Sequence, residues 1–121
     1  MHGAPREKLI MGMPLYGQSY TLASSSNHGL GAAATGPGSA GPFTGQGGLL
    51  GYNEICDFVK NQGWQVVGPI DEMGPYAYKD KEWVSYDDKA TIRKKVTKYS
   101  LFCISRDFIF RTYVYNFKSL F

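Results

Sequence analysis

The chain has 121 residues, of which 43% are hydrophobic and 19% are charged; this balance is typical of a globular domain and excludes an intrinsically disordered protein. The net charge is only +3, and no basic stripe is interleaved with stacking aromatics, so we exclude nucleic acid as a partner. Residues 1–6 carry no apolar signal region, and no window is an uninterrupted membrane span. We therefore expect a soluble chain with no signal peptide and no membrane partner. The sequence does not indicate an oligomeric state.

The first predicted elements are two successive strands. Residues 9–11 form a short apolar run that ends at Gly12 and Pro14, as a buried strand would. Residues 16–22 then alternate in polarity, which predicts a second strand, and we assign Tyr16, Ser19 and Thr21 to its exposed face.

A segment of small residues and a helix follow. Residues 23–48 are rich in Ala, Ser and Gly, and their composition alone is typical of a flexible linker. Residues 49–61 predict a helix with a single apolar stripe, because apolar side chains recur at helical spacing and Gly63 follows as a suitable end. The stripe consists of Tyr52, Ile55, Cys56 and Val59.

The last regular elements are a strand, a hairpin and a second helix. Residues 64–67 predict a strand, and residues 75–78 and 83–86 predict a hairpin around the polar turn 79–82. Asp87 or Asp88 then caps a helix whose buried side carries Ile92, Val96 and Tyr99. From residue 100 onward the chain is rich in phenylalanine and follows no pattern set by the preceding segments.

Two motifs carry a family resemblance when they are taken in order. The first runs Leu-Ile-Met-Gly-Met-Pro-Leu-Tyr-Gly-Gln-Ser-Tyr over residues 9–20, and the second runs Gly-Pro-Phe-Thr-Gly-Gln-Gly-Gly-Leu-Leu-Gly-Tyr-Asn-Glu over residues 41–54. The pair resembles the late part of the catalytic barrel, with its inserted domain, in chitinases of glycoside hydrolase family 18. The implied fold is α+β: a chitinase insertion domain, with an antiparallel sheet and one helix, flanked by remnants of a TIM (β/α)8 barrel.

The resemblance also implies the organisation of the chain. Residues 1–15 match a barrel strand, 16–86 the insertion domain and 87–99 the following barrel helix, whereas 100–121 diverge. It implies that residues 23–48 are folded and that residues 40–44 lie on the sheet of the insertion domain. The family's parent proteins are secreted, so we expect the intact protein to be extracellular.

The residues that family 18 uses for catalysis are absent from this sequence. The family supplies its acid from an Asp-x-x-Asp-x-Asp-x-Glu strand, while the acetamido group of the substrate acts as nucleophile. No such spacing occurs here. We interpret Asp71-Glu72 as part of a turn, Asp87-Asp88 as a helix cap and Glu54 as a surface or packing residue. We therefore predict no catalytic residue and a chain that is inactive alone, although its parent family hydrolyses chitin.

Four residues match sugar-facing positions of the family, and we predict that they bind chitin or N-acetylglucosamine oligomers: Tyr16, Gln18, Gln46 and Tyr52. Gln18 stands where the family has an arginine, and Gln46 where it often has a glutamate, so hydrogen-bonding capacity is kept but charge is lost. Each of the four also has a purely structural interpretation. Two further functions stay open: a non-catalytic, lectin-like protein and a non-functional truncated product.

No cofactor or metal site is predicted. The two histidines, His2 and His28, offer too few ligands for a metal. The two cysteines, Cys56 and Cys103, are compatible with one disulfide or with two free thiols. In the family, the residue that matches Cys56 pairs with a cysteine beyond the segment that still matches here, so the resemblance implies that Cys56 is unpaired.

Overall fold

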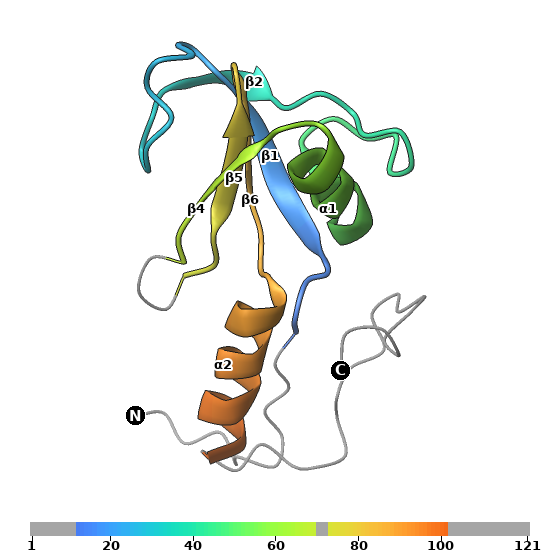
Figure 1. Ribbon diagram of the computed structural model, residues 1–121, viewed down its shortest axis with the longest axis vertical. Helices are drawn as coiled ribbons and strands as arrows, with labels where there is room; N and C mark the ends of the chain where they lie inside the picture. The colour runs from blue at the N-terminus through green and yellow to red at the C-terminus, as the bar shows by residue number, and fades with distance from the viewer. Residues whose placement is uncertain (1–11, 70–72, 102–121) are drawn as a thin grey trace, which may run out of the picture. The chain divides into compact units, whose positions relative to one another are not determined.

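The computed structural model describes residues 12–69 and 73–101, with side chains up to residue 98. The elements in chain order are β1 (Tyr16–Leu22), β2 (Ala34–Pro37), β3 (Leu49–Gly51), α1 (Tyr52–Asn61), β4 (Gln65–Val67), β5 (Tyr76–Lys79), β6 (Glu82–Ser85) and α2 (Lys89–Leu101). They belong to two compact units: Leu15–Asp88 and a unit that contains α2. The first unit is an antiparallel sheet with one helix, α1 (Figure 1). The predicted α+β class is confirmed.

Strand β1 has neighbours along both of its edges, in a sheet of order β2-β1-β6-β5-β4. On one edge, β6 pairs with residues 18–21 of β1. The other edge is shared, because β3 pairs with residues 16–18 and β2 with residues 20–22. Ser19 therefore lies between the two short strands.

The predicted strand at residues 16–22 is present, but its exposed face was assigned wrongly at Ser19, and Thr21 is only half-exposed. Tyr16 and Tyr20 are exposed, as is Gln18, whereas Gly17 is buried and Ser19 is only 1% exposed. Because successive side chains of a strand point to opposite faces, Ser19 shares the core face with Gly17. A small polar residue on a core face gives no hydrophobic signal in the sequence.

The core of this unit lies between the sheet and α1. Its buried residues are Leu50, Ile55, Ala77 and Val84, which Phe58, Val59, Trp64 and Tyr86 surround. The predicted apolar stripe of α1 is thus confirmed at Ile55, which is 1% exposed, with Tyr52, Cys56 and Val59 half-buried. Gly17 is required opposite the helix, because a Cβ there would lie 2.8 Å from Cδ1 of Ile55 and 2.6 Å from Cγ2 of Val84.

The first helix is shorter than the sequence predicted. Residues 49–51 belong to β3, because they pair with β1, and α1 begins at Tyr52. At the other end, Gly63 has a φ of +72° and the Trp64 N–H donates to the Phe58 carbonyl at 3.2 Å. Glycine suits this left-handed position, so the prediction that Gly63 suits the end of the helix is confirmed.

The predicted strand at 64–67 and the hairpin are both present. β4 pairs with β5, and β5 pairs with β6 from Tyr76 opposite Ser85 to Lys79 opposite Glu82. The turn is tighter than predicted, since only Asp80 and Lys81 lie outside the strands. Asp80 has a φ of +54°, a conformation that aspartate tolerates better than most residues.

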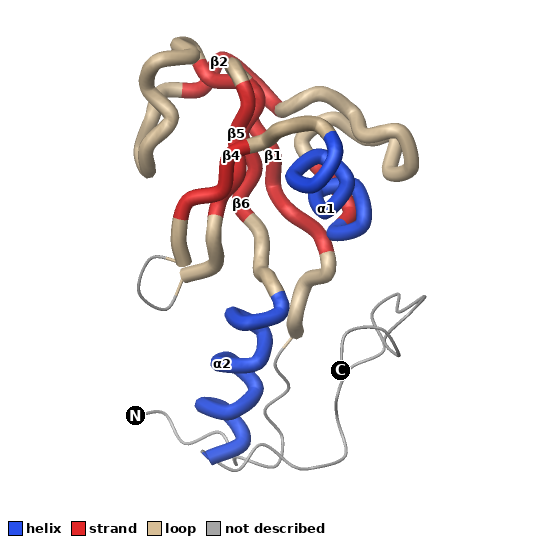
Figure 2. The backbone as a smooth tube through the Cα atoms, in the orientation of Figure 1, coloured by secondary structure: helices blue, strands red, loops and turns tan. Residues whose placement is uncertain are grey.

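Residues 23–48 are mostly loop, with β2 as a short interruption (Figure 2). They are nevertheless held to the sheet: the His28 ring stacks on Tyr78 with centroids 3.7 Å apart, and the His28 carbonyl accepts a hydrogen bond from Trp83 Nε1 at 3.1 Å. The compositional interpretation as a linker is therefore wrong. The expectation that residues 40–44 lie on the sheet is also wrong, because the strand in this segment is β2 and residues 42–44 form a turn.

The second predicted helix is present as α2, which starts directly after Asp88. Ile92 is buried and Val96 is half-buried, as predicted. Neither α1 nor α2 is long and apolar enough to cross a membrane. Several predictions lie outside the described residues: the strand at 9–11, the turn at Asp71-Glu72, Cys103 and the divergent segment after residue 101. The burial of Tyr99 also lies outside the described side chains.

Candidate functional site: a hollow beside the first strand

A hollow of about 560 Å³ opens on the sheet beside β1. Three segments line it: residues 18–20 of β1, the whole of β2, and residues 46–49. Its volume falls within the ~300–1,000 Å³ that is usual for small-ligand sites. It is open to solvent, so it offers a ligand a wall and not an enclosure.

The hollow forms where β2 and β3 meet along the shared edge of β1. There the Ser19 N–H donates to the Gly48 carbonyl at 2.9 Å, and the Gly38 N–H donates to the Ser19 carbonyl at 3.0 Å. The Gly48 N–H in turn donates to the Gly38 carbonyl at 2.9 Å. Gly48 has a φ of +81°, a conformation in which a residue with a Cβ is strained. These bonds fix the backbone on which the lining side chains stand.

Both polar and apolar side chains line the hollow, and none of the described lining residues carries a charge. Gln18 and Gln46 each offer an amide that donates and accepts hydrogen bonds. Leu49 lies opposite Gln18 in the β1–β3 pair, so the two side chains share a face of the sheet. Tyr20 is 43% exposed and presents an aromatic ring beside them. The arrangement can therefore hold a neutral ligand that has both hydroxyl or amide groups and an apolar side.

Two of the four predicted sugar-binding residues, Gln18 and Gln46, come together in this hollow. Tyr16 is 47% exposed and lies two residues before Gln18 on the same face of β1, but it is not part of the lining.

Tyr52 lies apart from the hollow, at the start of α1. Its ring is 6.3 Å from that of Tyr86, centroid to centroid. Burial, the nearby Cys56 and Asp88 together raise the pKa of Tyr52 to about 12, and burial, then Asp88, raises the pKa of Tyr86 to about 12. Both phenols are therefore protonated at neutral pH. Cys56 itself is a half-buried free thiol.

Sequence reasoning missed Tyr20, Leu49 and the whole of β2 as parts of the hollow. Tyr20 had a usable signal, because it follows Tyr16 and Gln18 at the spacing of one strand face. Leu49 was assigned to a helix, and β2 lies in a segment whose composition resembles a linker. Their contribution depends on pairing with β1 across the chain, which no local pattern encodes.

The carboxylates whose contacts the structure gives are occupied by structural hydrogen bonds. Glu54 accepts from backbone and hydroxyl donors, Glu82 accepts from the Ser39 N–H and hydroxyl, and Asp57 accepts from Asn61 and Gln62. Glu54 is only 1% exposed, so the interpretation of Glu54 as a surface residue is wrong. The alternative interpretation, a packing residue, agrees with its burial. Among the described residues, no group of three His, Cys, Asp or Glu side chains is arranged to hold a metal.

Comparison with known proteins gives a consistent result. The sequence profile described as glycosyl hydrolases family 18 matches residues 1–101. "Probable chitinase 10" of Drosophila melanogaster is 56% identical over 94 residues, which cover 77% of this chain and 4% of that protein. Human "Chitinase-3-like protein 2" is 48% identical over 94 residues, which cover 78% of this chain and 23% of that protein.

Solved structures agree. Catalytic domain 2 of the Ostrinia furnacalis Group II chitinase matches with a TM-score of 0.78 and 41% identity, over 82% of this chain and 26% of that one. Human YKL-39, described as a pseudo-chitinase with retained chitooligosaccharide binding properties, matches with a TM-score of 0.78 and 43% identity, over 84% of this chain and 27% of that one. The chain thus spans well under a third of each of these proteins.

Proposed function

Because the chain belongs to glycosyl hydrolase family 18, as its motifs predicted, we propose that its hollow binds oligomers of N-acetylglucosamine as one wall of a chitin-binding cleft. The observation that carries this proposal is the meeting of Gln18 and Gln46 in one hollow. The two residues come from motifs in different segments of the sequence, and both match sugar-facing positions of the family. Relatives described as binding chitooligosaccharides, such as human YKL-39, support the same ligand class.

The chemistry of the hollow favours an acetylated, uncharged sugar. Each amide of Gln18 and Gln46 can bond to a hydroxyl or to an acetamido group, since both ligand groups donate and accept. Tyr20 and Leu49 offer apolar surface to the C–H face of a sugar ring. A glucosamine unit carries an ammonium group, and no described lining residue supplies a carboxylate to pair with it. We therefore expect preference for acetylated oligomers.

For the whole protein we propose the organisation that the motifs indicate. Residues 16–86 would form the insertion domain, residues 1–15 and 87–99 would belong to a barrel strand and a barrel helix, and residues 100–121 would diverge from the family. The parent would be a secreted protein that binds chitin and, where it has the acid-bearing strand, hydrolyses it. Tyr16 would extend the sugar-facing wall next to Gln18. Tyr52 remains the weakest of the proposed contacts, because its ring lies with Tyr86.

For this chain alone we propose binding without hydrolysis. Its sequence has no Asp-x-x-Asp-x-Asp-x-Glu segment, and the described carboxylates named above serve as acceptors in structural bonds. The neutral pair Gln18 and Gln46 favours the lectin-like alternative over the truncated, non-functional one, because it retains hydrogen-bonding groups in the hollow. Clear release of product from a fluorogenic chitobioside by the purified chain would contradict this view.

The binding proposal is tested by titrating a soluble N-acetylglucosamine oligomer into the full chain and following amide resonances. We expect weak binding, because the hollow is open, with shifts at residues 18–20 and 46–49. The double variant Gln18→Ala, Gln46→Ala should weaken it by about tenfold or more, the equivalent of two lost hydrogen bonds.

The matched control for that double variant is Gln65→Ala, which removes an exposed glutamine on β4, away from the hollow. Gln65→Ala should bind as the unmodified chain does. A second arm replaces the ligand by a fully deacetylated oligomer, which should bind more weakly. Equal binding by the double variant, or shifts confined to other parts of the chain, would refute the hollow as the sugar site.

A further inference from the structure

Glu54 is a buried carboxylate that does not line the hollow. It is the third residue of α1 and is 1% exposed. A charge in such a position is strongly disfavoured unless hydrogen-bond donors surround it. The donors that surround the Glu54 carboxylate therefore identify the part of the chain that it binds.

The two oxygens of Glu54 bind both ends of one segment, residues 43–51, which consists of a loop and β3. Oε1 accepts from the backbone N–H of Phe43 at 2.7 Å and of Thr44 at 2.9 Å. Oε2 accepts from the Gly51 N–H at 2.6 Å and from the Thr44 hydroxyl. The Gly51 N–H also reaches Thr44 Oγ1, at 3.1 Å. One side chain thus closes the segment at its base.

Between these two ends lie four residues that line the hollow, residues 46–49. We propose that Glu54 is a positioning residue, whose carboxylate holds residues 43–51 in the shape that brings Gln46 and Leu49 to the hollow. The effect of Glu54 on sugar binding rests on the proposed function of the hollow. The effect of Glu54 on the shape of residues 43–51 rests on the hydrogen bonds alone.

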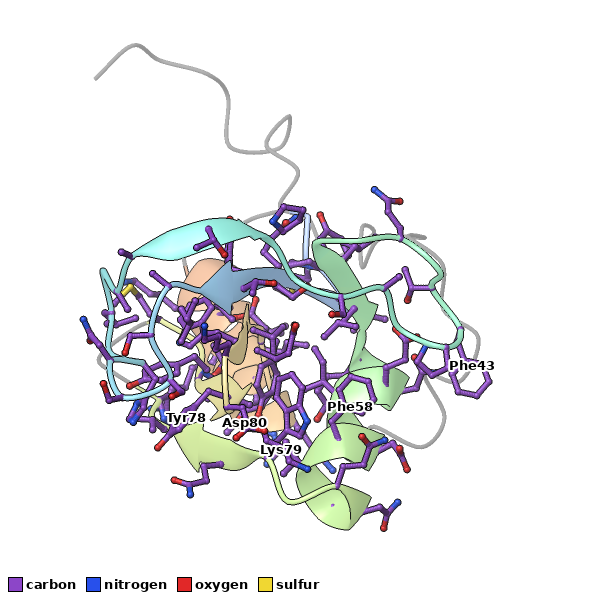
Figure 3. The ribbon with its side chains drawn as sticks, turned by 90° about the horizontal axis from the view of Figure 1, so that it is seen from above. Phe43, Phe58, Tyr78, Lys79 and Asp80 are labelled. Atoms are coloured by element: carbon purple, nitrogen blue, oxygen red, sulfur yellow. The ribbon has the colours of Figure 1, made fainter. Side chains whose placement is uncertain are left out.

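The neighbouring residues are adapted to this role. A Cβ at Gly41 would collide with the Glu54 carboxylate, so glycine leaves the space that the carboxylate fills. Phe43 presents its N–H inward while its ring is 80% exposed and points outward from the loop (Figure 3). The ring is therefore not what fixes the turn.

The charge state of Glu54 agrees with the geometry. Burial acts to raise the pKa of Glu54, but the hydrogen bonds from Thr44, Gly51 and Phe43 outweigh burial and hold the pKa below its ordinary value of 4.5. None of these three donors is a charged group. The carboxylate is therefore ionised at neutral pH and is stabilised by donors that belong to the segment it closes.

Hydrogen exchange of the full chain tests the proposal, because it reports each segment separately. Glu54→Gln replaces one acceptor oxygen by an NH₂ group that faces N–H donors. We expect amide exchange in residues 43–51 to become at least tenfold faster, with little change in the hairpin of β5 and β6. Asp57→Asn is the matched control, since it removes an exposed carboxylate from the same helix, and it should leave residues 43–51 unchanged.

A milder variant keeps the test decisive if Glu54→Gln fails to fold. Thr44→Val removes the hydroxyl between Glu54 and Gly51 while keeping the side-chain shape, and it should also accelerate exchange in residues 43–51, by a smaller factor. Unchanged exchange in that segment, or a uniform increase across the sheet, would overturn the proposal. A uniform increase would mean that Glu54 supports only global stability.

The sugar consequence has its own readout. If the unmodified chain binds the N-acetylglucosamine oligomer, Glu54→Gln should lower the affinity by about tenfold, whereas Asp57→Asn should not. If the unmodified chain does not bind it, the proposed function fails, while the exchange data still decide the role of Glu54. Normal sugar affinity in Glu54→Gln, together with faster exchange at 43–51, would refute the part that concerns Gln46 and Leu49.

Discussion

Replacing Gly17 by alanine should destabilise the sheet unit by about 2 kcal/mol. A Cβ at this position would lie 2.6 Å from Cγ2 of Val84, 2.7 Å from the Ser85 carbonyl oxygen and 2.8 Å from Cδ1 of Ile55. Val84 and Ile55 are fully buried, and Ser85 is fixed by its pairing with Gln18. Overpacking of this kind costs about 1–3 kcal/mol, and we take the upper end because backbone is involved. Alanine also lowers the conformational entropy of the unfolded chain relative to glycine, and this offsets up to about 1 kcal/mol of the cost.

Urea denaturation followed by the fluorescence of Trp64 and Trp83 measures this loss as a lower midpoint at unchanged slope. Gly36→Ala is the matched control, because a Cβ added at this position on β2 would have no atom within 4 Å. It should leave the free energy of unfolding unchanged or raise it by up to about 1 kcal/mol. If the free energy of unfolding of Gly17→Ala lies within about 0.5 kcal/mol of that of the unmodified chain, the close packing of α1 on β1 is wrong.

Three further predictions concern pH and the surface. The pKa values of Tyr52 and Tyr86 are raised to about 12 in the folded state, so the free energy of unfolding should fall as pH rises from about 10 to about 12. Tyrosinate absorbance should show two late-titrating phenols, and normal titration of all tyrosines would contradict this. Because folding lowers the pKa of Glu54, its contribution to the free energy of unfolding is present above pH 4.5 and is lost as pH falls through the folded pKa. Acid titrations should show this loss in the unmodified chain and not in Glu54→Gln. Phe43→Ser should change the free energy of unfolding by less than about 0.5 kcal/mol, because the ring is 80% exposed; a loss above about 1 kcal/mol would show that the ring is packed.

Locally encoded elements were predictable from the sequence. The hairpin of β5 and β6 follows from two short strands around a polar turn, and α1 follows from apolar side chains at helical spacing that end before Gly63. The family motifs then supplied the insertion-domain fold, which the match to solved chitinase structures confirms. The signals for the hairpin and for α1 each lie within about a dozen residues, where pattern and propensity act directly.

What could not be predicted depends on contacts between distant segments. Leu49 continues the apolar pattern of α1, yet it pairs with Gln18 and becomes strand. Ser19 looks like a surface residue, yet Gly38 and the core cover its side chain. Glu54 looks like a helix-surface carboxylate, yet donors from residues 43–51 surround it. In all three cases the long-range partner overrides the local preference.

The hollow lies within one compact unit of the chain, and this decides which experiments on the chain are informative. All of its lining lies between residues 18 and 49, within the compact unit Leu15–Asp88. The bonds that shape it, from Ser19 to Gly48 and from Gly51 to Glu54, also lie within that unit. The described bonds that position Gln18 and Gln46 therefore come from this unit, whereas enclosure of the proposed sugar would need a second wall. Weak binding with the correct residues perturbed is thus the result that distinguishes an intact wall from an unfolded fragment.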